Sequence, residues 1–183
     1  MQIAILGTGS VGRALADGLS AAGHTVRMGT RDPQTTMSRT EPDRFGTPPV
    51  SPWLAEHPGV SLVSFAEAAA SADLVVNATS GDVSLQALDA AGADSLRGKV
   101  LIDVSNPLDF SAGFPPTLFV KDTDSLGEQI QRAFPQARVV KTLNTMNAGL
   151  MLAPGRLSAP SAVFMSGDDE QAKQVVSGLL ASF

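Results

Sequence analysis

Short apolar runs recur along the chain, and segments with the spacing of amphipathic helices separate them. Residues 3–6 are an unbroken apolar run, which predicts a buried strand. Between residues 11 and 22 apolar side chains recur with the period of a helix, and Gly23 follows as a stop signal. The same pattern predicts further strands over 25–28, 60–63, 74–76, 100–102, 138–140 and 162–165, and further helices near 65–71, 83–91, 125–134 and 169–181.

The alternation of strands and helices predicts an α/β fold. Strands that are apolar on both faces are typical of a parallel sheet covered by helices on both sides. We therefore expect a Rossmann-like, doubly wound and mainly parallel sheet with helices on both faces. The 183 residues suit one domain, 1–183. Ser125 and Glu128 have the spacing of a capping box at the start of the helix 125–134.

Two segments interrupt the alternation. Residues 33–58 contain six of the 12 prolines and predict a long loop inserted where a simple unit of this kind would carry a helix. Loops of this length are usually functional or disordered. Trp53 and Leu54 indicate that part of this loop docks on an apolar surface. The second segment, 105–123, is rich in proline and glycine, and its pattern fits a lid and a surface excursion equally well.

A glycine fingerprint follows the first strand. The run Gly7-Thr8-Gly9-Ser10-Val11-Gly12 matches G-x-G-x-x-G, and its place between a strand and an amphipathic helix makes the match specific. Gly7 permits a tight turn, Gly9 lets the backbone approach a pyrophosphate, and Gly12 allows the helix to pack closely on the strand. The free N–H groups at the start of the helix would bind the pyrophosphate.

Polar side chains follow the other predicted strands. Ligands of such sheets bind beyond the carboxyl ends of the strands, so these residues are candidate ligands. They suit the sugars and the carboxamide of a dinucleotide, although Ser, Thr and Asn are also common helix N-caps. The candidates in these runs are Thr30, Arg31, Thr79, Ser80, Asn106 and Asn144.

The end of the second strand bears on the choice between NAD and NADP. Asp32 lies 20 residues after Gly12, near the spacing of an acid that binds the ribose of NAD. However, the strand is expected to end at residue 28 or 29, and Pro33 favours an extended or turn conformation for Asp32. Asp32 is therefore expected to cap a turn. Thr30 and Arg31 then lie at the ribose, where Arg31 can bind a 2′-phosphate, so the sequence predicts NADP(H).

The composition excludes several kinds of catalytic group, metal site and binding partner. The absence of cysteine excludes disulfides, thiolate metal sites and a cysteine nucleophile, and no metal-ligand cluster is expected. The net charge of −5 without a basic run argues against nucleic acid or an anionic membrane as partners. No apolar stretch approaches the ~20 residues that span a bilayer, and no signal peptide is evident, so we expect a cytoplasmic protein. Tyrosine is absent, and His24 and His57 are expected to be plain surface residues. Acid–base catalysis therefore has few candidates, and no catalytic residue is assigned.

The fingerprint, the pair Thr30-Arg31 and the run Lys141-Thr142-Leu143-Asn144-Thr145-Met146-Asn147-Ala148 resemble those of the coenzyme F420-dependent NADP reductase family. The resemblance implies a Rossmann domain that binds NADP(H) and exchanges hydride with a deazaflavin. It implies a phosphate-binding loop formed by Thr8, Gly9, Ser10 and Val11. It also implies that Thr30 and Arg31 bind the 2′-phosphate. It places the residues on the nicotinamide side at Ala78, Thr79, Ser80, Asn144, Met146 and Ala148.

The chain departs from this family in its proline-rich segment, at residues 77–80 and 144–147, where family members carry more apolar residues, and at its C-terminal end. The proline-rich segment 33–58 is longer, and family members usually continue beyond residue 183 with elements that help form the acceptor pocket and a dimer. A homodimer and an absent C-terminal segment are therefore expectations from the resemblance. The expected function is hydride transfer between NADPH and coenzyme F420 or a flavin-like acceptor. A β-hydroxyacid dehydrogenase would need a second helical domain, and a non-catalytic NADP(H)-sensing protein is the alternative.

Overall fold

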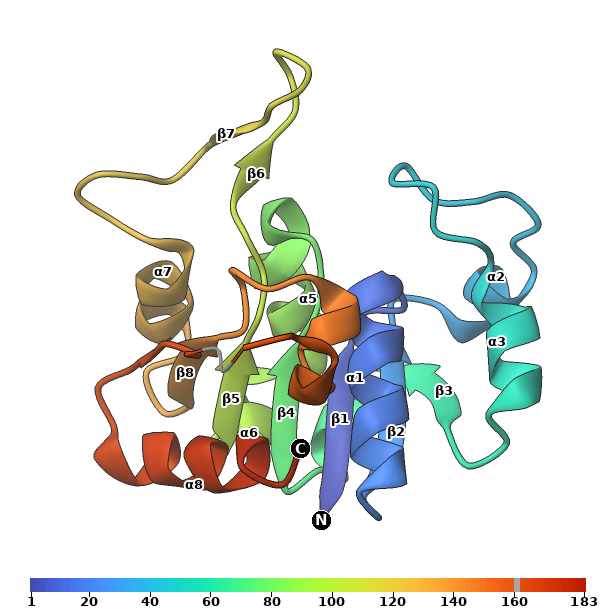
Figure 1. Ribbon diagram of the computed structural model, residues 1–183, viewed down its shortest axis with the longest axis horizontal. Helices are drawn as coiled ribbons and strands as arrows, with labels where there is room; N and C mark the ends of the chain where they lie inside the picture. The colour runs from blue at the N-terminus through green and yellow to red at the C-terminus, as the bar shows by residue number, and fades with distance from the viewer. Residues whose placement is uncertain (160–161) are drawn as a thin grey trace.

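A seven-stranded sheet forms the centre of the computed structural model, which describes residues 1–159 and 162–183 (Figure 1). The strand order is β3-β2-β1-β4-β5-β8-β9, and all neighbours pair in parallel except β9, which is antiparallel to β8. The order reverses between β1 and β4, which is where such sheets form a ligand crevice at their carboxyl edge. The strands are β1 (Gln2–Leu6), β2 (Thr25–Thr30), β3 (Ser61–Ser64), β4 (Leu74–Asn77), β5 (Val100–Asp103), β8 (Arg138–Thr142) and β9 (Met165–Ser166).

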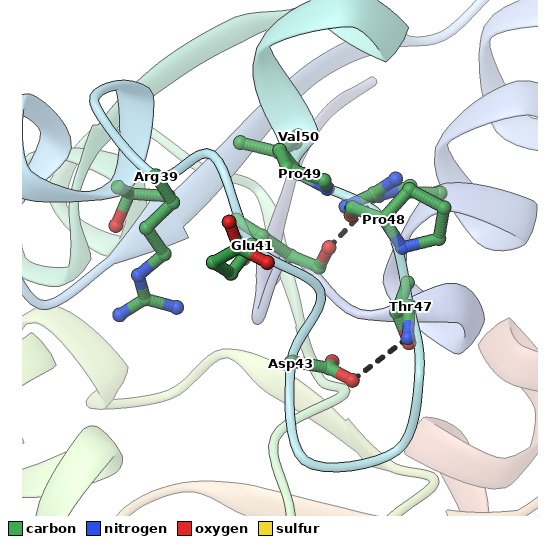
Figure 2. A pocket seen from close by; sticks show the side chains of 10 residues that line it. Arg39, Glu41, Asp43, Thr47, Pro48, Pro49 and Val50 are labelled. Carbon is green, nitrogen blue, oxygen red and sulfur yellow. Dashed lines mark hydrogen bonds between the residues drawn. The ribbon is translucent and has the colours of Figure 1, made fainter.

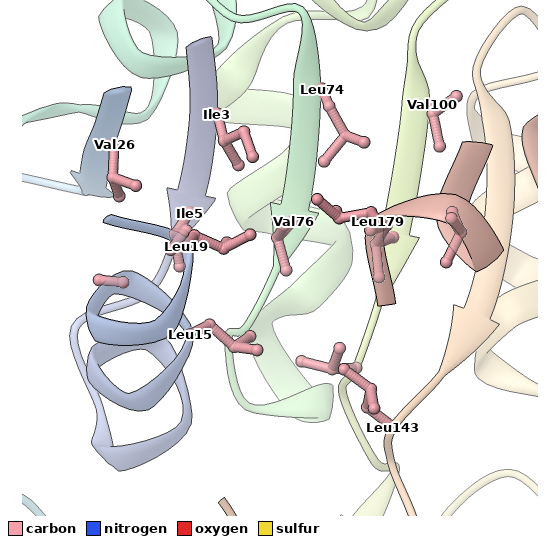
Figure 3. Packing of buried hydrophobic residues seen from close by; sticks show 14 of the residues in the cluster. Ile3, Ile5, Leu15, Leu19, Val26, Leu74, Val76, Val100, Leu143 and Leu179 are labelled. Atoms are coloured by element: carbon pink, nitrogen blue, oxygen red, sulfur yellow. The ribbon is translucent and has the colours of Figure 1, made fainter. Parts of the chain in front are cut away.

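Helices cover both faces of the sheet. Alternate residues of β1 point to opposite faces, so Ile3 and Ile5 join one core while Ala4 and Leu6 join another. In the first core the sheet packs against α1 and α8, as Figure 3 shows for Leu15, Leu19 and Leu179 among other residues. The second core is formed with α4 to α7. The helices are α1 (Ser10–Ala21), α2 (Pro33–Met37), α3 (Val50–Glu56), α4 (Phe65–Ala70), α5 (Ser84–Ala91), α6 (Ala93–Leu96), α7 (Leu126–Ala133) and α8 (Glu170–Leu180), with 3-10 turns η1 (Gly81–Val83), η2 (Ala148–Leu150) and η3 (Pro154–Arg156). The predicted doubly wound, mainly parallel fold is confirmed.

The segment 33–58 is not the continuous loop that its prolines predict, because it contains α2 and α3. Pro33 is the first residue of α2 and Pro52 lies in the first turn of α3. The N–H groups of a first turn have no partner within the helix, so proline costs no hydrogen bond there. Trp53 and Leu54 pack against the core, as predicted. Residues 38–49 connect the two helices.

Residues 105–123 contain a two-stranded antiparallel ribbon, β6 (Leu108–Asp109) and β7 (Thr117–Leu118), which rises from the carboxyl edge of the sheet (Figure 1). Its base packs closely on η1, because a Cβ on Gly81 would lie 2.2 Å from the carbonyl oxygen of Asn106. The ribbon therefore stands beside the crevice rather than over a distant part of the sheet.

The helix ends differ from the expected caps in one respect. The Ser125 hydroxyl accepts a hydrogen bond from Glu128 N, 3.2 Å away, but Ser125 N donates to Asp124, so only half of the expected capping box forms. The reciprocal box occurs instead at Ser64 and Glu67, at the start of α4. The strand expected over 162–165 is β9 at 165–166, which shares only Met165 with the expected range.

Candidate functional site

Two glycines of the fingerprint are required by the fold itself. Gly7 has a φ of +119°, and a Cβ there would lie 2.5 Å from the carbonyl oxygen of Ala78. A Cβ on Gly12 would lie 2.4 Å from the carbonyl oxygen of Gly7. Both contacts are too short for any side chain, so these glycines allow β1, β4 and the first turn of α1 to approach one another. The predicted roles of these two glycines agree with this geometry.

Gly9 differs from its two neighbours in the motif. It precedes α1 with φ −74° and ψ −176°, which any residue can adopt, and a Cβ there would meet no protein atom within 4 Å. Nothing in the described protein therefore requires glycine at this position. No side chain caps α1 within the described ranges, whereas Asp32, Ser64, Ser125 and Asp169 cap other helices. The start of α1 thus presents free N–H groups and open space, which is the arrangement that a bound pyrophosphate needs.

The end of β2 holds the residues expected at the ribose. The strand extends to Thr30, beyond the predicted end at residue 28 or 29, and Thr30 is only 8% exposed. Its hydroxyl lies 2.8 Å from that of Thr36 in α2, which leaves the pair one further proton to donate. Arg31 is exposed and follows directly. Asp32 accepts a hydrogen bond from Thr35 N at 2.9 Å, which lowers the pKa of its carboxyl group. As predicted, Asp32 caps a turn.

Replacing Asp32 with alanine is therefore expected to leave the cofactor preference unchanged. The carboxylate caps α2, where its Oδ1 accepts a hydrogen bond from Thr35 N, so we expect it to serve that helix and not a ribose hydroxyl. Calorimetric titration of the variant with NADPH and NADH would give the same ratio of dissociation constants as the wild type. A loss of NADH affinity alone would show that Asp32 binds the ribose hydroxyl groups. Our interpretation of the end of β2 would then be wrong.

A small pocket of about 30 Å³ lies between the fingerprint, α2 and residues 39–50 (Figure 2). Arg13 in α1 forms one wall: its Nε donates to the carbonyl oxygen of Thr8 at 2.9 Å, and its Nη2 donates to that of Pro48 at 2.6 Å. Burial lowers the pKa of Arg13. Thr36 and Arg39 also line the pocket. Neither arginine was among the predicted site residues: Arg13 directly follows the fingerprint, and the place of Arg39 in the pocket depends on the path of residues 38–49.

A chain of hydrogen bonds links the ends of β4, β5 and β8. The Thr79 hydroxyl donates to Asn77 Oδ1 at 2.7 Å, and Asn77 Nδ2 donates to Asp103 Oδ1 at 2.9 Å. Lys141 Nζ donates to Asp103 Oδ2 at 2.8 Å and to the carbonyl oxygen of Ser105. Asn77 and Asp103 are fully buried, so their polar groups are satisfied within the network. The network fixes the loop that carries the candidates Ala78, Thr79 and Ser80.

Asn106 and Asn144 bind each other. Asn106 Nδ2 donates to the carbonyl oxygen of Asn144 at 2.7 Å, and Asn144 Nδ2 donates to Asn106 Oδ1 at 3.1 Å. The pair joins the loops after β5 and β8. Met146 packs against the core near α1, and Ala148 begins η2. The structure thus gathers the candidates of three loops along one edge of the sheet, although Asn77, Asp103 and Lys141, which support them, were not among the predicted site residues.

Other groups lie away from this edge. His57 is not a plain surface residue: its Nε2 lies 2.8 Å from Asp17 Oδ1, and its ring stacks on Trp53. His24 lies at the opposite edge, 3.4 Å from the amino terminus. The described residues contain no group of three His, Cys, Asp or Glu side chains that could hold a metal ion. None of the helices within the described ranges is long and apolar enough to cross a membrane.

The fingerprint and the strand ends can be compared with known proteins. The family described as NADP oxidoreductase, coenzyme F420-dependent, matches residues 2–107, which is more than half of the chain. The chain belongs to this family. The match covers β1 to β5, including the fingerprint, the end of β2 and the loop that carries Thr79. The protein is accordingly an oxidoreductase of the NADP-dependent class, as its sequence predicts.

Relatives with known structures agree with membership of the NADP oxidoreductase family. A crystal structure of a protein from Arthrobacter sp. FB24, assigned as an F420-dependent NADP reductase, is 58% identical with a TM-score of 0.94, over 100% of this chain and 80% of that one. A hypothetical protein, SMa0349 from Sinorhizobium meliloti, is 26% identical with a TM-score of 0.68 over the same shares. Pyrroline carboxylate reductase from Plasmodium falciparum, with NADP bound, shares the fold at 15% identity and a TM-score of 0.61, over 100% of this chain and 55% of that one.

A curated relative extends the comparison to a larger protein. Metalloreductase STEAP3 from Rattus norvegicus is 29% identical over 176 residues, which are 96% of this chain. The chain spans only 31% of the length of that protein. The similarity therefore concerns the part of STEAP3 that corresponds to this domain.

Proposed function

We propose that this protein transfers hydride between NADPH and coenzyme F420 or a flavin-like acceptor. The observation that carries the proposal is the start of α1 at Gly9, where the fold needs no glycine and leaves room for a pyrophosphate. The family to which the chain belongs supports NADP as the dinucleotide. The name of the 58% identical Arthrobacter protein supports coenzyme F420 as the acceptor.

The residues present fit a dinucleotide that runs across the carboxyl edge of the sheet. In the proposed complex the N–H groups of Ser10 and Val11 bind the pyrophosphate, and Thr30 and Arg31 bind the 2′-phosphate. The buried network behind Thr79 holds the loop on the nicotinamide side in one conformation. A bound NADPH would supply a hydride and become NADP⁺, and a deazaflavin or flavin ring would accept that hydride together with a proton. The chain itself contributes mainly the alignment of two rings, which can supply a large part of a rate enhancement.

The β6–β7 ribbon supports a flat, apolar acceptor. It carries exposed aromatic side chains beside the crevice, and Phe114 is 89% exposed. Phe110 and Phe119 are also more than a third exposed. Aromatic rings favour offset stacking on other flat rings. The ribbon lies next to η1, and η1 directly follows the loop that carries Thr79 (Figure 1). An acceptor bound at the ribbon would therefore lie on the nicotinamide side of the crevice.

The proposal is tested by turnover with defined acceptors. Purified protein would be mixed with NADPH and, separately, coenzyme F420, FMN or FAD, while NADPH absorbance is followed. We expect oxidation of NADPH that requires both the protein and an acceptor, with NADH a poorer donor. Binding of NADPH in calorimetry without oxidation by any of these acceptors would contradict the proposed acceptor class and leave the cofactor assignment standing.

A further inference from the structure

Residues 38–49, which we term the strap, form an ordered connection between α2 and α3. The carboxylate of Asp43 accepts hydrogen bonds from the backbone N–H groups of Phe45 at 2.8 Å and Thr47 at 2.9 Å. The backbone of Asp43 also pairs with Thr47 and Gly46. Figure 2 shows Asp43 and Thr47 facing each other across this turn. The tip of the strap thus has a defined shape that presents Arg44 and Phe45 outward.

The tip of the strap binds elements on the far side of the crevice. Arg44 Nη2 donates to both carboxylate oxygens of Asp82 in η1, at 2.7 and 2.8 Å. The guanidinium of Arg44 lies 4.8 Å from the centre of the Phe45 ring, and that ring lies 5.6 Å from the ring of Phe110 in the loop between β6 and β7. The hydrogen bonds to Asp82 raise the pKa of Arg44. We call the pair Arg44–Asp82 the latch.

The two ends of the strap lie at the end of β2 and at α1, across the crevice from Asp82. Thr36, just before the strap, contacts Thr30 at the end of β2, and Arg13 holds the carbonyl oxygen of Pro48. Asp82 follows β4 after a short loop. Because β1 lies between β2 and β4 in the sheet, the strap and the latch cross from one side of the fingerprint to the other. A dinucleotide on the start of α1 would have the sheet edge beneath it and the strap above it.

We propose that the strap is a closing device for the dinucleotide, and that the latch slows release of bound NADP(H). The inference rests on the proposed function, since it needs NADP(H) at the start of α1. Arg44 and Asp82 act as positioning residues, because they hold the strap across the crevice and are assigned no contact with the reacting atoms. The latch must open for the cofactor to exchange. A stronger Arg44–Asp82 ion pair therefore gives slower dissociation of NADP(H).

The latch is exposed, and this limits the size of its effect. The side chains of Arg44 and Asp82 are 58% and 40% exposed. Exposed ion pairs contribute little to stability and are weakened by salt, so the expected change in dissociation rate is about two- to fivefold. The two partners are 38 residues apart in sequence and lie in different elements. Loss of the pair therefore affects how the strap is held and not the stability of a single helix.

The test measures dissociation of NADPH in a stopped-flow instrument, by displacing bound NADPH with excess NADP⁺ and following NADPH fluorescence. We expect Arg44→Ala and Asp82→Ala each to raise the dissociation rate about two- to fivefold at low salt. The exchanged variant Arg44→Asp with Asp82→Arg should return the rate toward that of the wild type. High salt should reduce the difference between wild type and single variants.

The matched control is Arg132→Ala. Arg132 binds both carboxylate oxygens of Asp124 at 3.0 and 2.8 Å with similar exposure, but it lies in α7. This variant should release NADPH at the wild-type rate. Unchanged or slower release from both latch variants, or an exchanged variant no better than the single ones, would overturn the proposal. If the wild type binds NADPH and reduces an acceptor in that case, the proposed function stands without the latch, whereas a wild type that does not bind NADPH contradicts both.

Discussion

Replacing Arg31 with alanine is expected to weaken NADPH binding by about 10- to 100-fold while leaving NADH binding nearly unchanged. Arg31 follows the last residue of β2 and is exposed at the edge where the ribose is expected. A hydrogen bond between a guanidinium and a phosphate contributes about 1.5–3 kcal/mol, and NADH lacks that phosphate. Calorimetric titration of wild type and variant with both nucleotides measures the effect.

A lysine at the same position provides a graded control. Arg31→Lys keeps the positive charge but loses the planar, two-pronged donor geometry, so it should retain part of the preference for NADPH. Arg31→Ala should also leave the melting temperature close to that of the wild type, since the side chain is exposed. Equal affinities of the wild type for NADH and NADPH, or a preference that survives Arg31→Ala, would refute the role assigned to this arginine.

Replacing Gly9 with valine is expected to abolish dinucleotide binding without unfolding the protein. The backbone at Gly9 suits any residue and a Cβ there meets nothing, so the added side chain is tolerated by the free protein. It would instead occupy the space of the pyrophosphate. The stability change should stay near the cost of replacing a glycine N-cap, about 1 kcal/mol or less. Thermal unfolding and calorimetry with NADPH measure the two effects separately.

Gly12 and Gly7 supply the contrasting control. Gly12→Val would place a side chain into the Gly7 carbonyl, and Gly7→Val would add strain at a positive φ as well as a clash with Ala78. Both variants are expected to lose stability severely, so their loss of binding carries no information about the ligand. If Gly9→Val bound NADPH with the affinity of the wild type, the pyrophosphate could not lie at Gly9, and the role assigned to the fingerprint would be wrong.

The fold was predictable because its signals are local. The central strands β1, β4 and β5 are short apolar runs, and Gly7, Gly12 and Gly23 stand where the backbone needs them. The turn at Asp32 was predictable for the same reason, since Pro33 restricts the residue before it. The short helices α2 and α3 were missed because proline was interpreted as a breaker, while in a first turn it is tolerated.

The candidate site was only partly predictable, because its support depends on residues distant in sequence. Asp103 and Lys141 could be placed at strand ends, but their ion pair depends on the neighbouring positions of β5 and β8. The contact between Thr30 and Thr36 depends on the turn into α2. The path of the strap could not be inferred, because exposed charges such as Arg44 and Asp82 have no periodicity that indicates a partner. The ligand roles of the predicted residues remain predictions.

The stack of Trp53 on His57 makes α3 optically distinct. Trp53 is the only tryptophan and the chain has no tyrosine, so its ultraviolet emission comes from one place. The two rings lie 4.0 Å apart and nearly parallel, and His57 contacts Asp17 in α1. Because α3 directly follows the strap, the indole lies in the first helix beyond it. Fluorescence of the unlabelled protein can therefore report displacement of α3 from α1, on the timescale of nucleotide exchange and without an introduced dye.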